Sequence, residues 1–143
     1  MNNLFLIARI GGETVALPSA AIGSVVEVDQ IAAVPRVAPH VAGLFALRSR
    51  VLTVVDTCVS LGAAARARTG VATAVIVECD GHSYALLVDA VDDVIEAPAV
   101  EPCPSVLAPG WRRAACGTIR LGGQALVLLD PAALVAGPEP LAA

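Results

Sequence analysis

Lysine is absent from this sequence of 143 residues, and aromatic side chains make up only 3% of it. Without lysine, the chain has no side chain for the phosphate contact of a P-loop or for Schiff-base chemistry. The net charge of −4, the shortage of rings for base stacking and the lack of a basic cluster argue against a nucleic-acid partner. These absences leave small hydrophobic side chains as the main material of the core.

Long uncharged runs are also missing, although 57% of the residues are hydrophobic. The longest stretch without a charge runs from Thr14 to Val26, which is shorter than the roughly 20 residues that a membrane-spanning helix needs. The N-terminal MNNLFLIAR has no basic start, and Arg9 interrupts its short apolar run, so it does not resemble a signal peptide. We therefore expect a cytoplasmic protein without membrane insertion.

No CxxC motif occurs, and the four cysteines are far apart in the sequence: Cys58, Cys79, Cys103 and Cys116. Neither a zinc ribbon nor a redox motif is indicated, and we expect these residues to be small buried hydrophobes. His40 and His82 lack recognisable ligand spacing and are expected on surface loops. The sequence therefore predicts neither a metal nor another cofactor.

What the sequence does contain is an internal repeat. The segment FLIARIGGETVALPSAAIGSVVEV, from Phe5, aligns with AVIVECDGHSYALLVDAVDDVIEA, from Ala74. After a small insertion in the second copy, GLFALRSRVLTVVD aligns with GTIRLGGQALVLLD, which places Gly43 on Gly117 and Asp56 on Asp130. Two halves of about seventy residues, each a small β-module, explain this order.

Each half has the pattern of short strands joined by hairpin turns. Gly11-Gly12 and Asp80-Gly81 predict type I′ turns. Expected strands cover residues 5–10, 14–17, 25–28, 43–47 and 51–56 in the first half, and 73–78, 83–88, 94–97, 117–121 and 124–130 in the second. Short helices are expected at 18–23, 57–61 and 131–135, where Pro or Thr after Asp suits an N-terminus. The expected fold is all-β, with two five-stranded barrels in a pseudo-symmetric tandem and few helices.

The domain boundaries follow from the repeat. We expect a single domain over residues 1–143, with a first barrel mainly over 15–70 and a second mainly over 71–135. The Ala- and Arg-rich segment 62–70 is the expected linker or exposed loop. Exchange of strands between the halves is compatible with this plan.

Candidate catalytic motifs are weak. GHSYA, residues 81–85, is similar to a nucleophile elbow, but a strand follows it, and no histidine follows His82. Asp56 and Asp130 end strands, where they are expected to cap the next turn. Asp89, Asp92, Asp93 and Glu96 form a cluster that we interpret as a solvated acidic edge. A hydrolase using Ser83 therefore stays a minor alternative to a non-enzymatic binding protein.

One hairpin carries more charge than its fold requires. The second copy turns with Gly122-Gly123, as backbone geometry favours, whereas the first copy uses Arg48-Ser49-Arg50. For Arg50, solubility and partner binding are equally good explanations. For Arg48 we favour function, because a guanidinium can hold a carboxylate through two hydrogen bonds.

At these residues the sequence resembles the CheW family of bacterial chemotaxis coupling proteins. The resemblance consists of Val25-Val26-Glu27-Val28, then Val34-Pro35, then GLFALRSRVLTVVD, and in the second half Leu87-Val88-Asp89 with Val91 and Val94. It covers the chain from about Phe5 to Leu134. The family glycine after the arginine is Ser49 here, and the family proline of the next strand is Thr53, so we expect a different turn shape at Ser49.

The resemblance implies two SH3-like five-stranded barrels and an adaptor without catalytic activity. Its implied partners are the regulatory domain of a chemotaxis-type histidine kinase and the cytoplasmic tip of methyl-accepting chemoreceptors. The kinase is expected on aliphatic edges of the first barrel and the helical receptor tip in the cleft between barrels. A related scaffold of pilus motility or surface sensing is the alternative system. The resemblance implies Arg48, Glu27 and Gly43 as partner-binding residues, with an ion pair between Arg48 and Glu27. We expect Val25, Val28, Ser49 and Arg50 to take part in binding as well.

Overall fold

The computed structural model describes residues 4–64, 70–97, 99–103 and 106–137. Nearly all of the regular structure in these residues is β-strand. The strands are β1 (Leu4–Ile10), β2 (Glu13–Pro18), β3 (Ile22–Val28), β4 (Val41–Leu47), β5 (Arg50–Asp56), β6 (Ala72–Cys79), β7 (His82–Val88), β8 (Ala90–Glu96), β9 (Ala115–Leu121) and β10 (Gln124–Leu129). The helices are the 3-10 turn η1 (Ser19–Ala21) and the short α-helices α1 (Thr57–Ser60), α2 (Pro109–Ala114) and α3 (Pro131–Ala136). None of these helices is long and apolar enough to cross a membrane.

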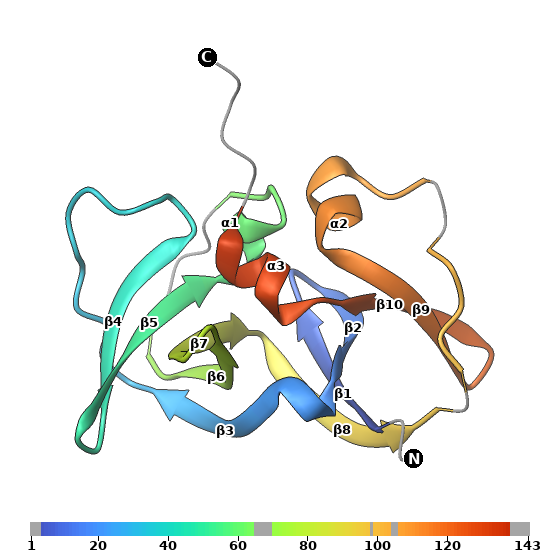
Figure 1. Ribbon diagram of the computed structural model, residues 1–143, viewed down its shortest axis with the longest axis horizontal. Helices are drawn as coiled ribbons and strands as arrows, with labels where there is room; N and C mark the ends of the chain where they lie inside the picture. The colour runs from blue at the N-terminus through green and yellow to red at the C-terminus, as the bar shows by residue number, and fades with distance from the viewer. Residues whose placement is uncertain (1–3, 65–69, 98, 104–105, 138–143) are drawn as a thin grey trace.

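The strands form two five-stranded sheets, which confirms the mostly-β prediction (Figure 1). Sheet A has the order β8-β1-β2-β10-β9, and sheet B has the order β3-β6-β7-β5-β4. The two orders correspond strand for strand under the sequence repeat. Each copy therefore inserts its first hairpin into the sheet of the other copy: β1–β2 joins β8–β10, and β6–β7 joins β3–β5.

Burial explains why the exchanged hairpins are the most hydrophobic strands. In β1, Leu6 and Ile10 face a central core between the sheets, whereas Phe5 and Ile7 face a separate core of sheet A. In β6, Val75 faces the central core while Ala74 faces the core of sheet B. A strand buried on both faces requires a continuous apolar run rather than an alternating one. The runs LFLIARI and ATAVIVEC are therefore expected where the two halves meet.

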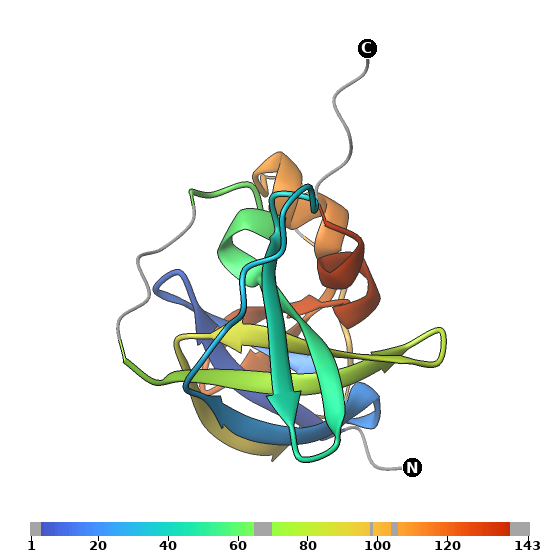
Figure 2. The ribbon, with the colours of Figure 1, turned by 90° about the vertical axis from the view of Figure 1, so that its left-hand side faces the viewer.

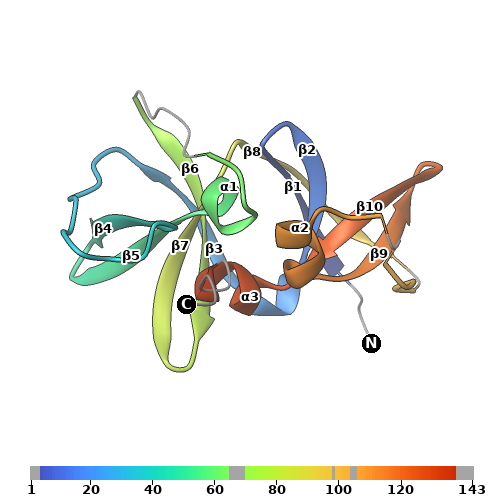
Figure 3. The same ribbon diagram turned by 90° about the horizontal axis from the view of Figure 1, so that it is seen from above.

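The three helices lie together at one end of the region between the sheets (Figure 1 and Figure 3). Leu61, Ala114 and Leu134, which lie in or next to these helices, complete the central core. Two helices begin as predicted: Asp56 Oδ1 accepts from Cys58 N at 3.0 Å, and Asp130 Oδ1 accepts from Ala132 N at 3.1 Å. The helix expected over 18–23 is instead the three-residue turn η1, because β3 already begins at Ile22. Helix α2 lies in the insertion that only the second copy has.

Two sites differ from the sequence-based expectations. His40 is only 6% exposed, not on the surface, and its Nε2 donates to the Val135 carbonyl at 2.8 Å. The prediction of buried cysteines is correct for Cys58 but wrong for Cys116, which is exposed, and Cys79 and Cys103 are half-buried. The expected linker over 62–70 falls largely outside the described residues.

Arg113 of α2 joins all three α-helices. Its guanidinium donates from Nη1 to the Ala133 carbonyl at 2.7 Å and from Nη2 to the Ser60 carbonyl at 2.9 Å. Ser60 in turn donates from Oγ to the Leu134 carbonyl at 2.7 Å. The half-buried arginine thus adds hydrogen bonds to the last carbonyl of α1 and to the Ala133 carbonyl of α3, which also accepts from the Gly137 N–H at 3.2 Å.

Replacing Arg113 by methionine should lower the free energy of unfolding by about 2–3 kcal/mol, because hydrogen bonds from a charged donor are lost in a partly buried place. Urea unfolding followed by circular dichroism measures this change. Arg120→Met is the matched control, because Arg120 is 66% exposed and pairs only at the surface with Glu101. It should cost less than about 1 kcal/mol. Equal losses for both variants would contradict the role assigned to Arg113.

Candidate interaction surface

The β4–β5 hairpin turns at Arg48 and Ser49, both exposed. Arg48 has a φ of 57°, whereas Ser49 does not have a positive φ. The other three hairpins each have positive φ at both central residues, as type I′ turns require. A positive φ at the first central residue alone is the pattern of a type II′ turn. Because serine occupies the second position, only Arg48 has a positive φ in this turn. The turn therefore differs in shape from the other three.

Strand β3 supplies the exposed side chains next to this turn. Val25 is 43% exposed and Glu27 is also exposed, whereas Val28 is 2% exposed. The alternation is that of a strand with one face against a core and one face in solvent. Val28 packs into the core of sheet B and so lies beneath the surface that Val25 and Glu27 form.

A single bridge places the β4–β5 turn beside β3. After β3 ends, Ala32 pairs antiparallel with Leu44 through two hydrogen bonds, Ala32 N to Leu44 O at 2.8 Å and Leu44 N to Ala32 O at 2.9 Å. In an antiparallel arrangement, the turn four residues after Leu44 lies level with the residues four before Ala32. Arg48 therefore lies on the same side of this bridge as Glu27 and Val28, and Figures 1 and 2 show the turn at the same lower side of the molecule as β3.

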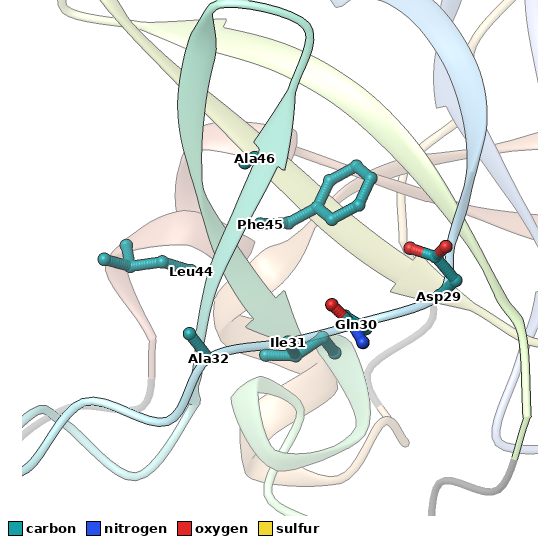
Figure 4. Close-up of a pocket in the computed structure, with 7 residues that line it drawn as sticks. All are labelled: Asp29, Gln30, Ile31, Ala32, Leu44, Phe45 and Ala46. Atoms are coloured by element: carbon teal, nitrogen blue, oxygen red, sulfur yellow. The ribbon is translucent and has the colours of Figure 1, made fainter.

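A hollow opens between these two segments where the pairing ends. It has a volume of about 520 Å³ and is lined by Asp29, Gln30, Ile31, Ala32, Leu44, Phe45 and Ala46. Figure 4 shows the Phe45 ring between β4 and Asp29, while Leu44 points away from the ring. Asp29 gives this aliphatic and aromatic hollow an acidic edge, next to the exposed Glu27.

A second hollow of about 580 Å³ lies at the other end of β3. It is lined by η1, the first residues of β3, Ile76 and Glu78 of β6, Ser83 of β7 and Arg50 of β5. Arg50 Nη2 donates a hydrogen bond to Ser83 Oγ across its wall. We call the exposed residues of β3, the two hollows and the Arg48–Arg50 segment the β3 surface.

The ion pair expected between Arg48 and Glu27 is not formed among the described residues. Both side chains are exposed, so the Arg48 guanidinium and the Glu27 carboxylate can each hydrogen-bond to a partner. Elsewhere, Arg9 pairs with Asp92 and Arg120 with Glu101, each at 3.1 Å. The acidic edge of β8 is thus partly neutralised by β1, and the described residues contain no cluster of three or more potential metal ligands.

Gly43, another expected partner-binding residue, is buried and has a structural reason to be glycine. Its φ is 148°, and an added Cβ would lie 2.3 Å from the Ala32 carbonyl oxygen. The aligned Gly117 has the same role, since its Cβ would lie 2.4 Å from Val100 Cγ1. In both copies a glycine in a β-bulge lets the segment after β3 or β8 cross closely over the next strand.

The geometry gives no support to a hydrolase. Ser83 accepts its hydrogen bond from Arg50, and neighbouring side chains of a strand such as Ser83 and His82 point to opposite faces. His40 is engaged with Val135, near the C-terminal helix. These groups do not converge as a nucleophile and its base would need to.

The chain is a duplicated β-protein whose β3 surface combines exposed charged groups with apolar walls. The profile of the family described as CheW-like domain matches residues 4–139, so this chain belongs to the CheW-like domain family. Among solved structures it is similar to the scaffolding protein TtCheW from Thermoanaerobacter tengcongensis, with a TM-score of 0.79 and 22% identity over 90% of this chain and 89% of that one. A comparison with curated proteins found no match.

The sequence pointed to the arginine turn and to Glu27, but of the residues that line the two hollows it indicated only Arg50 as partner-binding. Ile31 and Phe45 showed no pattern distinct from core residues, and Glu78 lies in a strand of the other sequence copy. Only the pairing of β3 with β6, and of Ala32 with Leu44, brings these residues together.

Proposed function

We propose that this chain is a non-catalytic cytoplasmic adaptor that couples chemoreceptors to a chemotaxis-type histidine kinase. The observation that carries the proposal is membership of the CheW-like domain family over residues 4–139. The exposed arginine turn beside Val25 and Glu27 supports it, because the turn does not require arginine for its fold. The partners follow from the family rather than from this surface alone.

We assign the regulatory domain of the kinase to the β3 surface. Its hollows offer apolar walls at Ile31 and Phe45, with charged groups at the rim. This arrangement of an apolar centre and a polar rim is typical of protein interfaces. The exposed Val25 and the guanidinium of Arg48 are the anchors that such an interface would use.

We assign the helical receptor tip to the surface where the two halves meet, outside the central core. An adaptor must hold both partners at once, and the duplicated architecture supplies surfaces beyond the one on β3. On β8, Val94 and Glu96 are exposed at the positions equivalent to Val25 and Glu27. The two partners would thus bind different parts of the molecule.

Binary binding tests the proposal. Purified chain would be titrated with the isolated regulatory domain of a chemotaxis-type kinase encoded by the same organism, and separately with a soluble receptor-tip fragment, by isothermal calorimetry. Specific binding of both is expected. Binding of neither would contradict the proposal, whereas binding only to components of a pilus or surface-sensing system would move the adaptor to that system.

A further inference from the structure

Two of the four cysteines lie on facing segments of the second half of the chain. Glu101, in the connection between β8 and α2, pairs antiparallel with Thr118 of β9 through two hydrogen bonds of 2.8 Å. The Thr118 hydroxyl also donates to the Pro102 carbonyl at 3.3 Å, so the connection follows β9 beyond the bridge. Figure 1 shows the described residues 99–103 of this connection on the outer side of β9.

Continued two residues past this bridge, an antiparallel course would bring Cys103 opposite Cys116. Cys103 lies two residues after Glu101, and Cys116 lies two residues before Thr118, so an antiparallel course brings them to the same level. Opposite residues of this kind have Cα atoms about 5.5 Å apart, within the range of about 4.4–6.8 Å that a disulfide spans. The register therefore suits a cross-strand disulfide.

Cys116 differs from its neighbours in β9, and its thiol donates a hydrogen bond to the Leu128 carbonyl at 3.5 Å. Leu128 pairs with Gly117 and Leu129 with Ala115, which leaves Cys116 as the extra residue of a β-bulge. Burial raises the pKa of the Cys116 thiol, and Asp130 and the Cys103 sulfur raise that pKa further. The effect of Cys103 on this pKa is consistent with the two sulfur atoms lying near each other.

The fold itself does not require cysteine at these positions. In the first half, the Ala32–Leu44 bridge has the same geometry, and the equivalent facing residues are Val34 and Ala42. Ala42 is likewise the extra residue of a bulge, between Val41 and Gly43. The thiol pair is thus an addition to the second copy, in a position that the first copy fills with hydrophobic side chains.

We propose that Cys103 and Cys116 form a site of reversible thiol oxidation, in which they are joined by an intramolecular disulfide. The oxidant is a low-molecular-weight disulfide of the glutathione type. The Cys103 thiolate attacks one oxidant sulfur and releases the first thiol; the Cys116 thiolate then attacks the Cys103 sulfur of the mixed disulfide and releases the second. Two protein thiols lose two electrons and two protons, and the oxidant becomes two thiols.

Oxidation would close a ring that contains α2. Arg113 of α2 is hydrogen-bonded to α1 and α3. The disulfide would therefore link the segment beside β9 more tightly to this group of helices. A closed ring lowers the conformational freedom of the unfolded chain, so the oxidised protein should unfold at a higher temperature than the reduced protein. Reversible disulfides of this kind serve as sensors in reducing compartments.

The test is a thiol count on the full-length chain after incubation with oxidised glutathione in alkaline buffer, where the Cys116 thiolate is more abundant. Titratable thiols in denaturant should fall from four to two in a monomer, with a mass lower by two hydrogen atoms. Arginine-directed cleavage should link the peptide 114–120, which contains Cys116, to the peptide 69–112. That second peptide also contains Cys79, so variants must identify the partner.

Cys79→Ala should retain the disulfide, whereas Cys103→Ser and Cys116→Ser should each abolish it. As a positive control of the geometry, Val34→Cys with Ala42→Cys should add a second disulfide in the first half. Four free thiols after oxidation in the wild type, or a link that survives Cys103→Ser, would overturn the proposal. Because Cys116 is exposed and Cys103 half-buried, these variants should fold, and circular dichroism checks that they do.

Discussion

Replacing Gly43 by alanine is expected to lower the free energy of unfolding by about 3 kcal/mol or more. Two costs add at this position. The φ of 148° strains any residue with a Cβ, and the new methyl group would lie 2.3 Å from the Ala32 carbonyl oxygen and 2.8 Å from Ile31 Cγ2. Left-handed strain costs about 1–2 kcal/mol and overpacking about 1–3 kcal/mol. Relief would require the segment after β3 to move away from β4.

Gly81→Ala separates these two costs. Gly81 has a φ of 79° but no atom within 4 Å of a Cβ added to it, so only the backbone strain of about 1–2 kcal/mol is expected. Gly117→Ala should resemble Gly43→Ala, since the second copy has the same crossing. Denaturant unfolding of the three variants gives the comparison. A loss at Gly43 no larger than at Gly81 would contradict the close crossing of the segment after β3.

The second large effect concerns binding. Arg48→Ala should weaken binding to the kinase regulatory domain by about 2 kcal/mol, or about 30-fold, because an exposed arginine anchor is removed from the β3 surface. The fold should be unaffected, since no hydrogen bond within the described residues depends on the Arg48 side chain. Calorimetric titration of wild type and variant measures the difference.

Arg48→Gly makes this test independent of stability. Glycine adopts a φ of 57° without strain, so this variant should be more stable than wild type by about 1 kcal/mol, yet it lacks the same guanidinium. Both variants should lose the same affinity. Arg120→Ala, at an exposed arginine of sheet A, should bind as wild type does. Unchanged binding by Arg48→Gly and Arg48→Ala would remove Arg48 from the interface.

Much of the fold follows from the internal repeat. Alignment of Gly12 with Gly81 predicted the paired hairpins, and alignment of Asp56 with Asp130 predicted the two aspartates that cap α1 and α3. Both predictions were possible because turns and helix caps depend on neighbouring residues alone. The match of both sheet orders shows that the copies also share long-range pairing.

The exchange of hairpins could not be assigned from sequence. A repeat fits equally well whether each hairpin joins its own half or the other half, and the parallel pairs β2–β10 and β5–β7 join strands far apart in the chain. The available signal was the continuous apolar run in β1 and in β6, because a strand between two layers is buried on both faces. His40 was misassigned for a similar reason: its partner, the Val135 carbonyl, lies 95 positions away.

The candidate surface was predicted in part. Comparison of the two turns identified Arg48 as additional to the fold, but the contribution of Val28 and Gly43 could be seen only once their burial was known. Both residues shape the surface from beneath, through the core of sheet B and the crossing at Ala32. The exposed group comprises Val25, Glu27, Arg48, Ser49 and Arg50.

The central claim is that this chain joins a receptor to a kinase through two sites. Cosedimentation with vesicles that carry a full-length chemoreceptor tests it most directly, with the kinase from the same organism in the soluble phase. The account predicts that the kinase sediments with the vesicles only when this chain is added, and that Arg48→Gly reduces the sedimented kinase while the chain itself still sediments with the receptor. A kinase that sediments equally well without the chain, or stays in solution in its presence, would contradict it.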